Sequence, residues 1–504
     1  MSSKLRQRSV VSSFICTSPE SSTGLTFALF KRSQDVSTYR GKWAVCSGSI
    51  DPTDASPQAA AKREILEETK LSDNDISILR RGKPFSLKDE ELQTEWTIHP
   101  FAWQLNDGAR EISFDWEHTE YKFIKPEDLA NYDHVPQLEL GMERVMVSPE
   151  TEEGLAVLRD DHESGAQALA LKSLEILLGM MGGDKLESLR TSEEFWRELR
   201  WRAWHLAKNG RPSMGAAIEA NLFQTLDIVN DEWLTGSKGI AGISLSNIKA
   251  AVGSAITNKI AGGKQSLEPI AKSFLGYVQS NYNSQDSPKS IKIVTLSASG
   301  TIHQCLTTLI KGVSQDTTIH ITFLESRPKF EGATAATNLF STFANKPEIM
   351  DRLKIEIIPD ASIATAVVNA DYVIFGSDKV IPNGNVSNKI GSCAAAVTVK
   401  ALNPACKVVA LFETDKITSS EFDSEYLTVE ANDEIGITNA WSLGIVFRLK
   451  NQNNKITVRN EYFEWVPAKY IDAHISEQGI LSAKDMERLG LEVVELEKRL
   501  FGDL

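Results

Sequence analysis

The sequence has little cysteine, no long apolar run and no excess of positive charge. Among its 504 residues are five cysteines, Cys16, Cys46, Cys305, Cys393 and Cys406, and none of them belongs to a Cys-x-x-Cys pair. An odd, scattered set argues against a secreted disulfide scaffold or a zinc ribbon and favours a reducing compartment. No apolar run approaches the roughly 20 residues of a membrane-spanning helix. We therefore expect a cytoplasmic protein with no membrane partner.

The charge balance is acidic. Lys and Arg number 54 against 68 Asp and Glu, which gives a formal net charge of −14. Because no surplus of basic residues is available to neutralise phosphates, we expect no direct nucleic-acid binding. Small anionic ligands remain compatible with this balance through bound metals and helix N-termini. The length predicts two or three domains.

An acidic helix is the strongest chemical signal in the chain. Ser56 and Pro57 form a helix start, with Ser as the N-cap and Pro at the first helical position. Glu64, Glu67 and Glu68 then share one face of the helix, where like charges repel. This crowding indicates a missing partner, and a hard divalent cation such as Mg²⁺ suits an all-oxygen site. The alternative is a solvated acidic face, since such patterns are common on exposed helices.

The surroundings of this helix favour the first interpretation. A tryptophan-bearing strand is expected at 42–45, a turn follows at Gly48, and Leu71 closes the motif. From Gly48 to Ser72 the sequence resembles the Nudix hydrolase box, a loop-helix-loop that carries Arg-Glu, an aliphatic residue, any residue and Glu-Glu. The resemblance covers residues 8–148.

The resemblance implies an α/β/α Nudix fold and a metal-dependent hydrolase. Mg²⁺ or Mn²⁺ would be bound by Glu64, Glu67 and Glu68 and would activate water for attack on a phosphoanhydride. A nucleotide or nucleotide sugar would be the substrate. Residues 116–129 look like the Nudix strand and short helix beyond the box, and Glu120 in this segment is a candidate extra metal ligand or base.

Two positions depart from the Nudix pattern. The glycine expected before the closing aliphatic residue is Lys70, and glycine normally ends a helix in the left-handed conformation. We therefore expect this turn to end differently. The glutamate expected before the helix falls near Ala55, with Asp51 and Asp54 close by. The loop around the metal is expected to be altered.

The rest of the chain divides by composition and periodicity. Beyond the first domain, short apolar segments rich in β-branched residues alternate with helical stretches, which predicts a doubly wound, Rossmann-like parallel sheet. The expected strands are 291–297, 319–325, 354–359, 371–376 and 407–412. The expected parts are a linker at 149–156, a helical subdomain at 157–285, the sheet domain at 286–485 and a C-terminal helix at 486–504. That last helix either docks on the body or forms an oligomer contact.

Polar residues follow the predicted strands, where ligands of open parallel sheets bind. Ser297 and Gly300 belong to a small-residue loop that opens a helix and offers N–H groups to an anion. Arg327 and Lys389 are candidates to hold a phosphate, and Asp378 is a candidate acid or base. Each feature alone is typical of a tight turn or a helix cap. Their recurrence at successive strand ends favours a ligand site.

Four separated segments also carry a family resemblance. They resemble the superfamily of initiation factor 2B alpha, beta and delta subunits, methylthioribose-1-phosphate isomerase and ribose-1,5-bisphosphate isomerase. The segments are 210–218, 323–336, 371–392 and 461–481. The resemblance covers residues 157–485 and implies a ribose phosphate ligand and a homodimer or higher homo-oligomer.

In these isomerases a cysteine after the first strand and an aspartate after a later strand transfer protons. The aspartate matches Asp378, but the cysteine position is Ser297. A hydroxyl is a far poorer proton donor than a thiol, whose pKa is about 8.5. Cys393 is a candidate replacement thiol. The implied phosphate or ribose contacts are Arg211, Gly300, Asn388 and Lys389, while Arg327 is alternatively a brace between loops.

Three functions remain open at this stage. The first is a Nudix hydrolase whose product is bound or isomerised by the second domain. The second is a regulatory or scaffold protein that senses nucleotides or sugar phosphates without isomerase turnover, which Ser297 favours. In the third, both halves have lost their activity, and the intact acidic helix argues against this for the first half.

Overall fold

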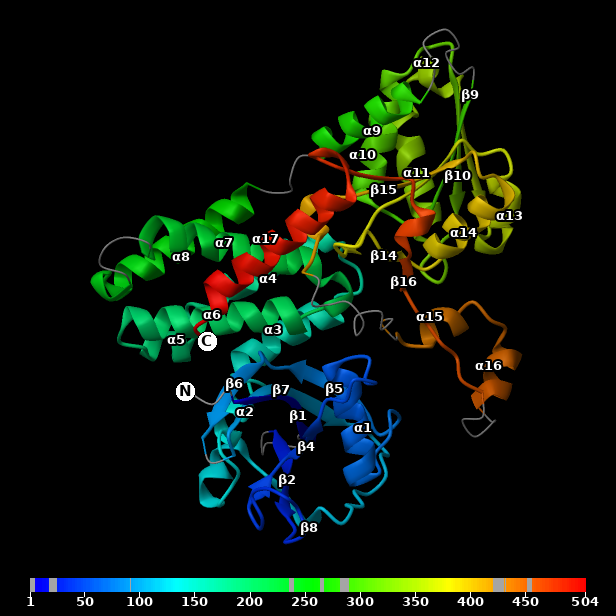
Figure 1. The fold of residues 1–504 in the computed structure, drawn as a ribbon. Coiled ribbons are helices and arrows are strands. Elements are labelled where there is room, and N and C mark those ends of the chain that lie inside the picture. The colour runs from blue at the N-terminus through cyan, green and yellow to red at the C-terminus, as the bar shows by residue number, and fades with distance from the viewer. Residues whose placement is uncertain are drawn as a thin grey trace. The chain divides into compact units, whose positions relative to one another are not determined.

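The computed structural model describes residues 5–17, 25–90, 92–234, 240–262, 267–281, 290–419, 430, 432–450 and 456–504. The chain forms two compact units, Met1–Glu153 and Gly154–Leu504, each with its own core (Figure 1).

A mixed eight-stranded sheet forms the centre of the first unit. Its strands are β1 (Arg6–Thr17), β2 (Thr26–Arg32), β3 (Trp43–Ala44), β4 (Cys46–Ser49), β5 (Ile76–Arg81), β6 (Phe85–Asp89), β7 (Thr94–Leu105) and β8 (His118–Ile124). The main path is β3-β2-β1-β7-β5, with β4 beside β1, β6 beside β7 and β8 beside β2. The long strands β1 and β7 pair in parallel at its centre.

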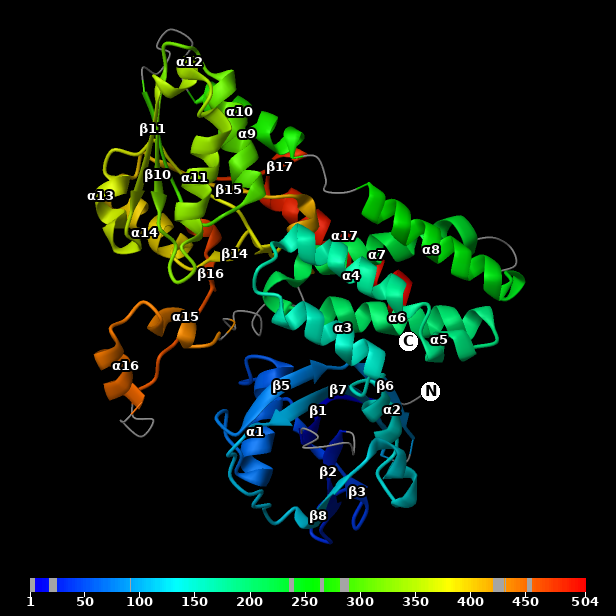
Figure 2. The same cartoon turned by 180° about the vertical axis from the view of Figure 1, so that it is seen from behind.

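Helices cover both faces of this sheet. Helix α1 (Pro57–Thr69) packs Ala61 and Ile65 into one core cluster. The short helices η1 (Pro126–Asn131) and α2 (Leu138–Glu143) place Leu129 and Leu138 in another. Figure 2 shows α1 and α2 on opposite sides of the strands. The predicted α/β/α layering is confirmed.

The segment predicted to be a linker, 149–156, is helical instead. It belongs to α3 (Pro149–Asp160). Ser148 accepts a hydrogen bond at its Oγ from the Thr151 N–H, 3.4 Å away, and Pro149 takes the first helical position. This is the helix-start pattern that Ser56 and Pro57 form in α1. The polarity of the segment reflects the acidic first turn of a helix. The boundary between the two compact units, Glu153 to Gly154, lies within the range predicted for the linker.

The second unit begins with a group of helices, as predicted. They are α4 (Ala166–Met180), α5 (Asp184–Ser188), α6 (Ser192–Asn209), η2 (Pro212–Met214), α7 (Gly215–Val229), η3 (Asn230–Leu234), η4 (Ile240–Gly242) and α8 (Leu245–Ala261). Helix α7 contacts α4, α6 and α8. Its small residues Ala216 and Ala217 are buried, which permits this close packing.

A seven-stranded sheet follows. Its strands are β9 (Ser290–Thr295), β10 (Thr318–Leu324), β11 (Leu353–Ile358), β12 (Tyr372–Phe375), β15 (Lys407–Leu411), β17 (Ala473–Ser476) and β18 (Gly479–Leu481). Their order is β11-β10-β9-β12-β15-β17-β18, and every neighbouring pair is parallel except β17 with β18. The five predicted strands are all present and parallel.

The sheet is wound on both faces. Helices α9 (Glu268–Ser280), α10 (Gly300–Gly312) and α11 (Glu331–Phe343) share a core cluster with one face. Helices α13 (Ile363–Val367) and α14 (Ser392–Leu402) share a cluster with the other. The chain turns from one half of the sheet to the other between β9 and β12, which is where such folds form a crevice. Helix α9 lies in the range expected for the helical subdomain but packs on the sheet.

Smaller elements complete the second unit. A three-stranded antiparallel sheet joins β13 (Lys379–Val380), β14 (Val386–Lys389) and β16 (Phe463–Val466). Among the described residues, the other short helices are α12 (Pro347–Met350), η5 (Asp360–Ser362), η6 (Thr414–Lys416), α15 (Ile435–Thr438), α16 (Leu443–Lys450) and η9 (Ala468–Tyr470). The last helix, α17 (Ala483–Phe501), contacts α7.

Ion pairs with α6 hold α17 and the residues that follow it. The Lys208 ammonium on α6 lies 2.9 Å from carboxylate oxygens of both Glu219 on α7 and Glu497 on α17. The Arg200 guanidinium on α6 binds the Asp503 carboxylate through both terminal nitrogens. Of the two alternatives for the C-terminal helix, docking on the body is therefore observed.

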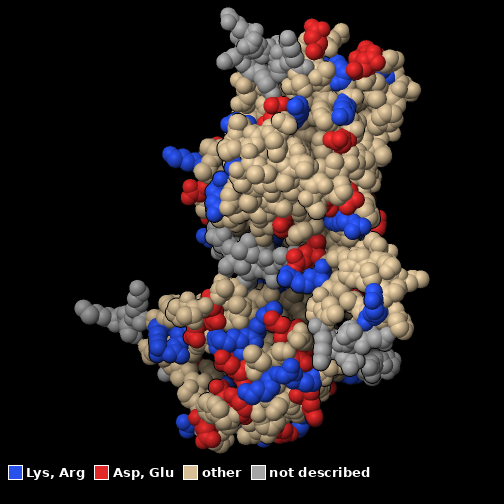
Figure 3. All heavy atoms as spheres, turned by 90° about the vertical axis from the view of Figure 1, so that its right-hand side faces the viewer, with Lys and Arg blue, Asp and Glu red and all other residues tan. Residues whose placement is uncertain are grey.

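None of the described helices is long and apolar enough to cross a membrane. On the face drawn in Figure 3, Lys and Arg lie among Asp and Glu and form no broad basic area.

Candidate functional site

The acidic helix α1 begins and ends at well-defined caps. Ser56 accepts a hydrogen bond at its Oγ from the Ala59 N–H at 3.0 Å. At the other end Lys70 has φ +61°, in the left-handed region, and its N–H donates to the Leu66 carbonyl. The expectation that the turn would end differently without glycine was wrong. A lysine adopts the conformation that glycine favours, at a cost in backbone strain.

Arg63 organises the carboxylates at the start of the site. Its guanidinium lies 2.8 Å from Glu64 and 3.4 Å from Glu67. Asp54 accepts two hydrogen bonds from Arg63, at 3.1 and 2.9 Å, which hold the pKa of Asp54 below its usual range. Asp51 is 3.8 Å away. Between the two candidates near Ala55, Asp54 makes the closer, bidentate contact.

Glu68 is the most deeply buried carboxylate of the cluster. Its residue is 3% exposed, and its Oε1 accepts from the Ser47 N–H at 3.2 Å. Its Oε2 has no hydrogen-bond partner among the described residues. Burial, followed by the charges of Glu64 and Glu117, raises the pKa of Glu68 well above its usual range. Among the described residues Glu68 therefore has no cation to balance its charge.

Gly48 makes room for the carboxylate of Glu64. A Cβ at position 48 would lie 2.0 Å from the Glu64 carboxyl carbon, far inside van der Waals contact. Burial raises the pKa of Glu64 despite the opposing effect of Arg63. The glycine in the motif thus has a steric reason, because it brings the backbone against the acidic cluster.

Glu120, the predicted extra ligand, does not join this cluster. It lies on β8 with its side chain 41% exposed, and it pairs with Lys122 at 2.9 Å. Glu117 contributes instead, because its charge raises the pKa of both Glu64 and Glu68. Sequence reasoning missed Glu117, since it lies in the turn before β8 where strand alternation gives no signal.

The residues of this site fit a hard divalent cation by chemistry. The donors are carboxylate oxygens, they raise one another's pKa, and the buried Glu68 Oε2 has no partner. Across the described ranges, no three His, Cys, Asp or Glu side chains already converge closely enough to hold an ion. Binding would therefore require Arg63 to release part of its hold on Glu64 and Glu67.

A second site occupies the crevice of the second unit. A cavity of about 570 Å³ lies outside the ends of β9 and β12. Its lining includes most of the residues predicted there, namely Arg211, Ser297, Gly300, Asp378, Asn388 and Lys389. Arg327 is not among the lining residues. Its guanidinium lies 5.2 Å from the centre of the Phe330 ring and 3.4 Å from Glu325, which matches the alternative of a loop brace.

Ser297 sits in a strained loop and faces a carboxylate. Its φ is +64°, and its N–H donates to the Ser326 Oγ at 2.7 Å. Its own Oγ donates to Glu331 at 3.1 Å, and Glu331 in turn pairs with Lys389 at 3.2 Å. The hydroxyl that stands at the cysteine position is therefore committed as a hydrogen-bond donor.

Asp378 lies among cations in the same cavity. Burial raises the pKa of Asp378, while the ammonium groups of Lys416 and Lys389 oppose this effect. Lys416 is 5% exposed, and its ammonium forms no ion pair with a described residue. A buried cation without an ion-pair partner is a ready contact for a phosphate.

Other predicted contacts are already engaged within the protein. Arg211 is buried, and its guanidinium lies 3.1 Å from Glu430. The Asn388 side chain binds the Ser392 hydroxyl at 2.7 Å. Gly300 opens α10, whose N-cap is Ser299. These residues shape the cavity, and Lys389 and Lys416 supply its positive charge.

Cys393 does not lie in the cavity lining. Its N–H donates to Glu464 at 2.9 Å, and burial raises the pKa of its thiol. The candidate replacement thiol is therefore neither placed at the site nor activated.

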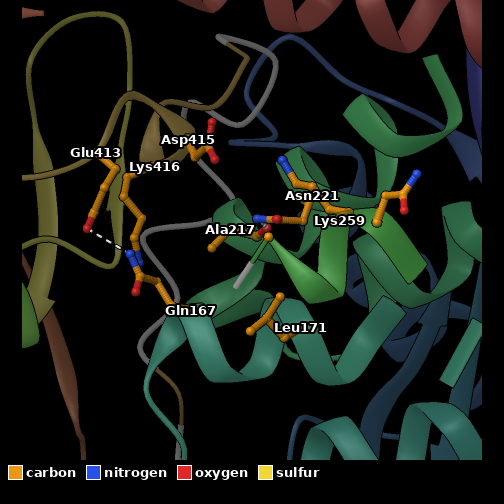
Figure 4. A pocket seen from close by; sticks show the side chains of 10 residues that line it. Gln167, Leu171, Ala217, Asn221, Lys259, Glu413, Asp415 and Lys416 are labelled. Carbon is orange, nitrogen blue, oxygen red and sulfur yellow. Dashed lines mark hydrogen bonds between the residues drawn. The ribbon is translucent and has the colours of Figure 1, made fainter. Parts of the chain in front are cut away.

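A smaller cavity of about 240 Å³ adjoins the 570 Å³ cavity of the second unit (Figure 4). Gln167, Glu413 and Lys416 line both cavities. Figure 4 shows Gln167 reaching Glu413, with a hydrogen bond of 3.0 Å. Sequence reasoning missed Glu413 and Lys416 although they directly follow β15. The strand-end rule applied to that strand would have found them.

Comparison with known proteins agrees with this division of the chain. Residues 7–145 match the profile of the NUDIX domain. Residues 162–483 match the profile of the Initiation factor 2 subunit family. The chain therefore carries a NUDIX domain and belongs, through the larger part of its length, to the Initiation factor 2 subunit family.

Two curated relatives are sugar-phosphate isomerases by name. A ribose 1,5-bisphosphate isomerase of Haloterrigena turkmenica is 25% identical over 199 residues, 39% of this chain and 55% of the relative. A methylthioribose-1-phosphate isomerase of Natranaerobius thermophilus is 28% identical over 165 residues, 32% of this chain and 43% of the relative. The chain thus spans about half the length of these relatives.

Solved structures similar to this chain include two from Pyrococcus horikoshii OT3. The translation initiation factor eIF-2B is 20% identical, covers 66% of this chain and 98% of its own, and has a TM-score of 0.45. The 5-methylthioribose 1-phosphate isomerase is 17% identical, covers 69% of this chain and 88% of its own, and has a TM-score of 0.45.

Proposed function

We propose that the NUDIX domain hydrolyses a phosphoanhydride in a nucleoside diphosphate-linked substrate. The observation that carries this proposal is the crowding of Glu64, Glu67 and Glu68 on α1, with the buried Glu68 Oε2 left without a partner. Bound Mg²⁺ or Mn²⁺ would supply charge neutralisation and an activated water. Glu64, Glu67 and Glu68 are the residues that would hold it.

The other residues of the site have supporting roles in this proposal. Arg63 holds Glu64 and Glu67 in the metal-free chain through its contacts of 2.8 and 3.4 Å. Asp54 fixes Arg63 from the other side at 2.9 Å. Glu117, and not Glu120, is the additional carboxylate that accepts a proton or helps to hold the ion.

The test is a pair of matched variants in the full chain. Glu67→Gln removes a charge from the cluster, and we expect hydrolysis to fall by about 10²-fold or more. Glu120→Gln removes an exposed charge outside the cluster, and the rate should stay within about twofold. Dinucleotides, nucleotide sugars and nucleoside triphosphates would be screened with Mg²⁺ and Mn²⁺, and every product identified. Hydrolysis by Glu67→Gln at the wild-type rate would refute the assignment.

For the second unit we propose a ribose phosphate ligand in the larger cavity. Lys389 and Lys416 supply positive charge, and Asp378 lies beside them. Replacing Lys416 by Gln should weaken the thermal stabilisation produced by the bound ribose phosphate and raise its Kd by about 10–100-fold. Arg327→Gln, which changes a charge outside the cavity, is the control and should bind normally.

A sensor without turnover is the second candidate for this unit, and one observation favours it. The Ser297 hydroxyl donates to Glu331, and no cysteine lies in the cavity lining. Incubation of the full chain with ribose phosphates, followed by NMR, separates the two. Conversion of an aldose to a ketose phosphate supports an isomerase, and saturable stabilisation without conversion supports a sensor. Coupling between hydrolysis and ligand binding remains part of the proposal.

A further inference from the structure

A buried histidine adjoins the acidic cluster without using either of its ring nitrogens. The His118 side chain, the first residue of β8, is 1% exposed. Its Nε2 lies 3.6 Å from the Glu68 Oε2, and its Nδ1 lies 3.8 Å from the Asp115 carboxylate. Both nitrogens and the Glu68 Oε2 lack a hydrogen-bond partner among the described residues. Three unsatisfied polar atoms thus lie together.

Packing alone gives no reason for a histidine here. The ring lies against Phe30, with 5.1 Å between the ring centres, and an apolar side chain would fill the same space. A buried polar atom without a partner is destabilising, because it gives up its hydrogen bonds to water and gains none in the protein. This cost is offset if the His118 ring forms a hydrogen bond with the Glu68 carboxylate when that carboxylate binds an ion.

We propose that His118 is a positioning residue for Glu68 in the metal site. When a divalent cation is bound, the Nε2–H, which lies 3.6 Å from the Glu68 Oε2 in this structure, moves within hydrogen-bond distance and donates to the carboxylate. This bond fixes the orientation of the carboxylate, so that its other lone pairs remain directed to the cation. A carboxylate has about four acceptor positions, so it can accept from Ser47 and His118 and still bind an ion. This inference rests on the proposed hydrolase function.

The role of His118 follows the general behaviour of groups behind metal ligands. Such partners orient the ligands, and their loss typically weakens metal binding by about 10–100-fold. A neutral donor suits this place. The cluster already holds Glu64 and Glu117 beside Glu68, and a donor lowers the cost of a third charge without competing with the cation as a second positive group would.

The test measures Mn²⁺ binding to the full chain by the EPR signal of free Mn²⁺, with Mg²⁺ in competition. His118→Leu keeps the apolar volume and loses the donor, and its Kd for Mn²⁺ should rise by about 10–100-fold. His118→Gln places an amide N–H near the position of Nε2 and should retain most of the affinity. Thermal unfolding in EDTA reports whether each variant is folded before metal is added.

A second measurement needs no substitution. With ¹⁵N-labelled histidine, the imidazole resonances of the wild-type chain are followed during addition of diamagnetic Mg²⁺. One ring among the eight histidines of the chain should shift with the same midpoint as metal binding. The signal missing from His118→Gln identifies it. If no histidine resonance responds while Mg²⁺ binds, the inference is wrong.

The outcomes separate this inference from the hydrolase proposal. Weak Mn²⁺ binding by Glu67→Gln together with wild-type binding by His118→Leu would overturn the role of His118 alone. Equal losses in His118→Leu and His118→Gln would also overturn it, because a donor would not rescue binding. A wild-type chain that binds no Mn²⁺ would remove the metal site itself, and the role of His118 with it.

Discussion

The two sites differ in how far their polar groups are already satisfied. In the NUDIX domain, Glu68 and His118 leave buried polar atoms without partners. In the second unit, Glu413 accepts from Gln167 at 3.0 Å and from Thr301 at 3.1 Å, and Ser297 is bonded to Glu331. In the first site a buried carboxylate oxygen and both imidazole nitrogens have no hydrogen-bond partner among the described residues, whereas in the second a ligand meets the buried Lys416 but must compete with existing contacts of the other polar groups. A buried polar group without a partner therefore says more about the ligand of a site than a group that is already hydrogen-bonded.

The largest expected effect concerns the paired charges of the second unit. Lys208→Met leaves the buried Glu219 without the cation that it shares with the partly exposed Glu497, and we expect a loss of about 3–5 kcal/mol in the free energy of unfolding. Lys272→Met is the control, because its ion pair with Glu268 is exposed and is worth at most about 1 kcal/mol. Urea unfolding measures both. Equal losses would show that burial does not distinguish the two pairs.

In the acidic cluster, by contrast, we expect removal of a charge to increase the free energy of unfolding. Glu68→Gln removes a buried carboxylate whose Oε2 has no hydrogen-bond partner among the described residues, so the chain without metal should gain about 1–2 kcal/mol in stability while hydrolysis is lost. Glu67→Gln, whose side chain is 57% exposed, should change stability much less. Denaturant unfolding in EDTA tests this, and a clear destabilisation by Glu68→Gln would contradict the view that this charge is unmet.

For Asp378, in the second site, the effect of removing the charge on stability should depend on pH. Burial raises its pKa, so the folded chain holds the proton more tightly than the unfolded chain does. The stability that this provides is present at low pH and is lost as the pH rises through the ordinary carboxyl range and up to the raised pKa. Asp378→Asn should therefore raise Tm at about pH 7.5 and change it little at about pH 4. A larger gain at the lower pH would contradict the direction of the shift.

The smallest effect is expected at the helix end that holds the cluster in place. Lys70 has φ +61°, and Lys70→Gly relieves strain at the cost of a more flexible unfolded chain. We expect a gain of up to about 1 kcal/mol in unfolding free energy. Lys62→Gly, in the interior of α1, should instead lose about 1 kcal/mol. A loss at both positions would show that the turn is not strained.

Much of the fold could be predicted from sequence, because its signals are local. The β-branched segments gave five parallel strands, and Ser56 with Pro57 gave the start of α1. The same start at Ser148 and Pro149 was missed, since polarity was interpreted as a linker. Helix starts are thus more reliable than average polarity for deciding where a helix lies.

The candidate sites were predictable only in part. The acidic face of α1 and the cavity lining around Asp378 and Lys389 followed from spacing and strand ends. Glu117 and His118 could not be found in this way, because their place beside Glu68 depends on how β8 lies next to β2. Arg327, which the sequence left open between a phosphate contact and a loop brace, contacts Phe330 and Glu325 outside the cavity lining, because a cation after a strand need not point into the crevice.

Glu413 joins two layers of the second unit at a single atom. Its Oε1 accepts from Gln167 on α4, in the helical group, and from Thr301 on α10, on the sheet. A molecule that displaced Gln167 from this oxygen would uncouple the helical group from the sheet at the mouth of the crevice. Binding of a ligand in the cavity could then be detected by hydrogen exchange, as faster exchange of the amide protons in the first turns of α4.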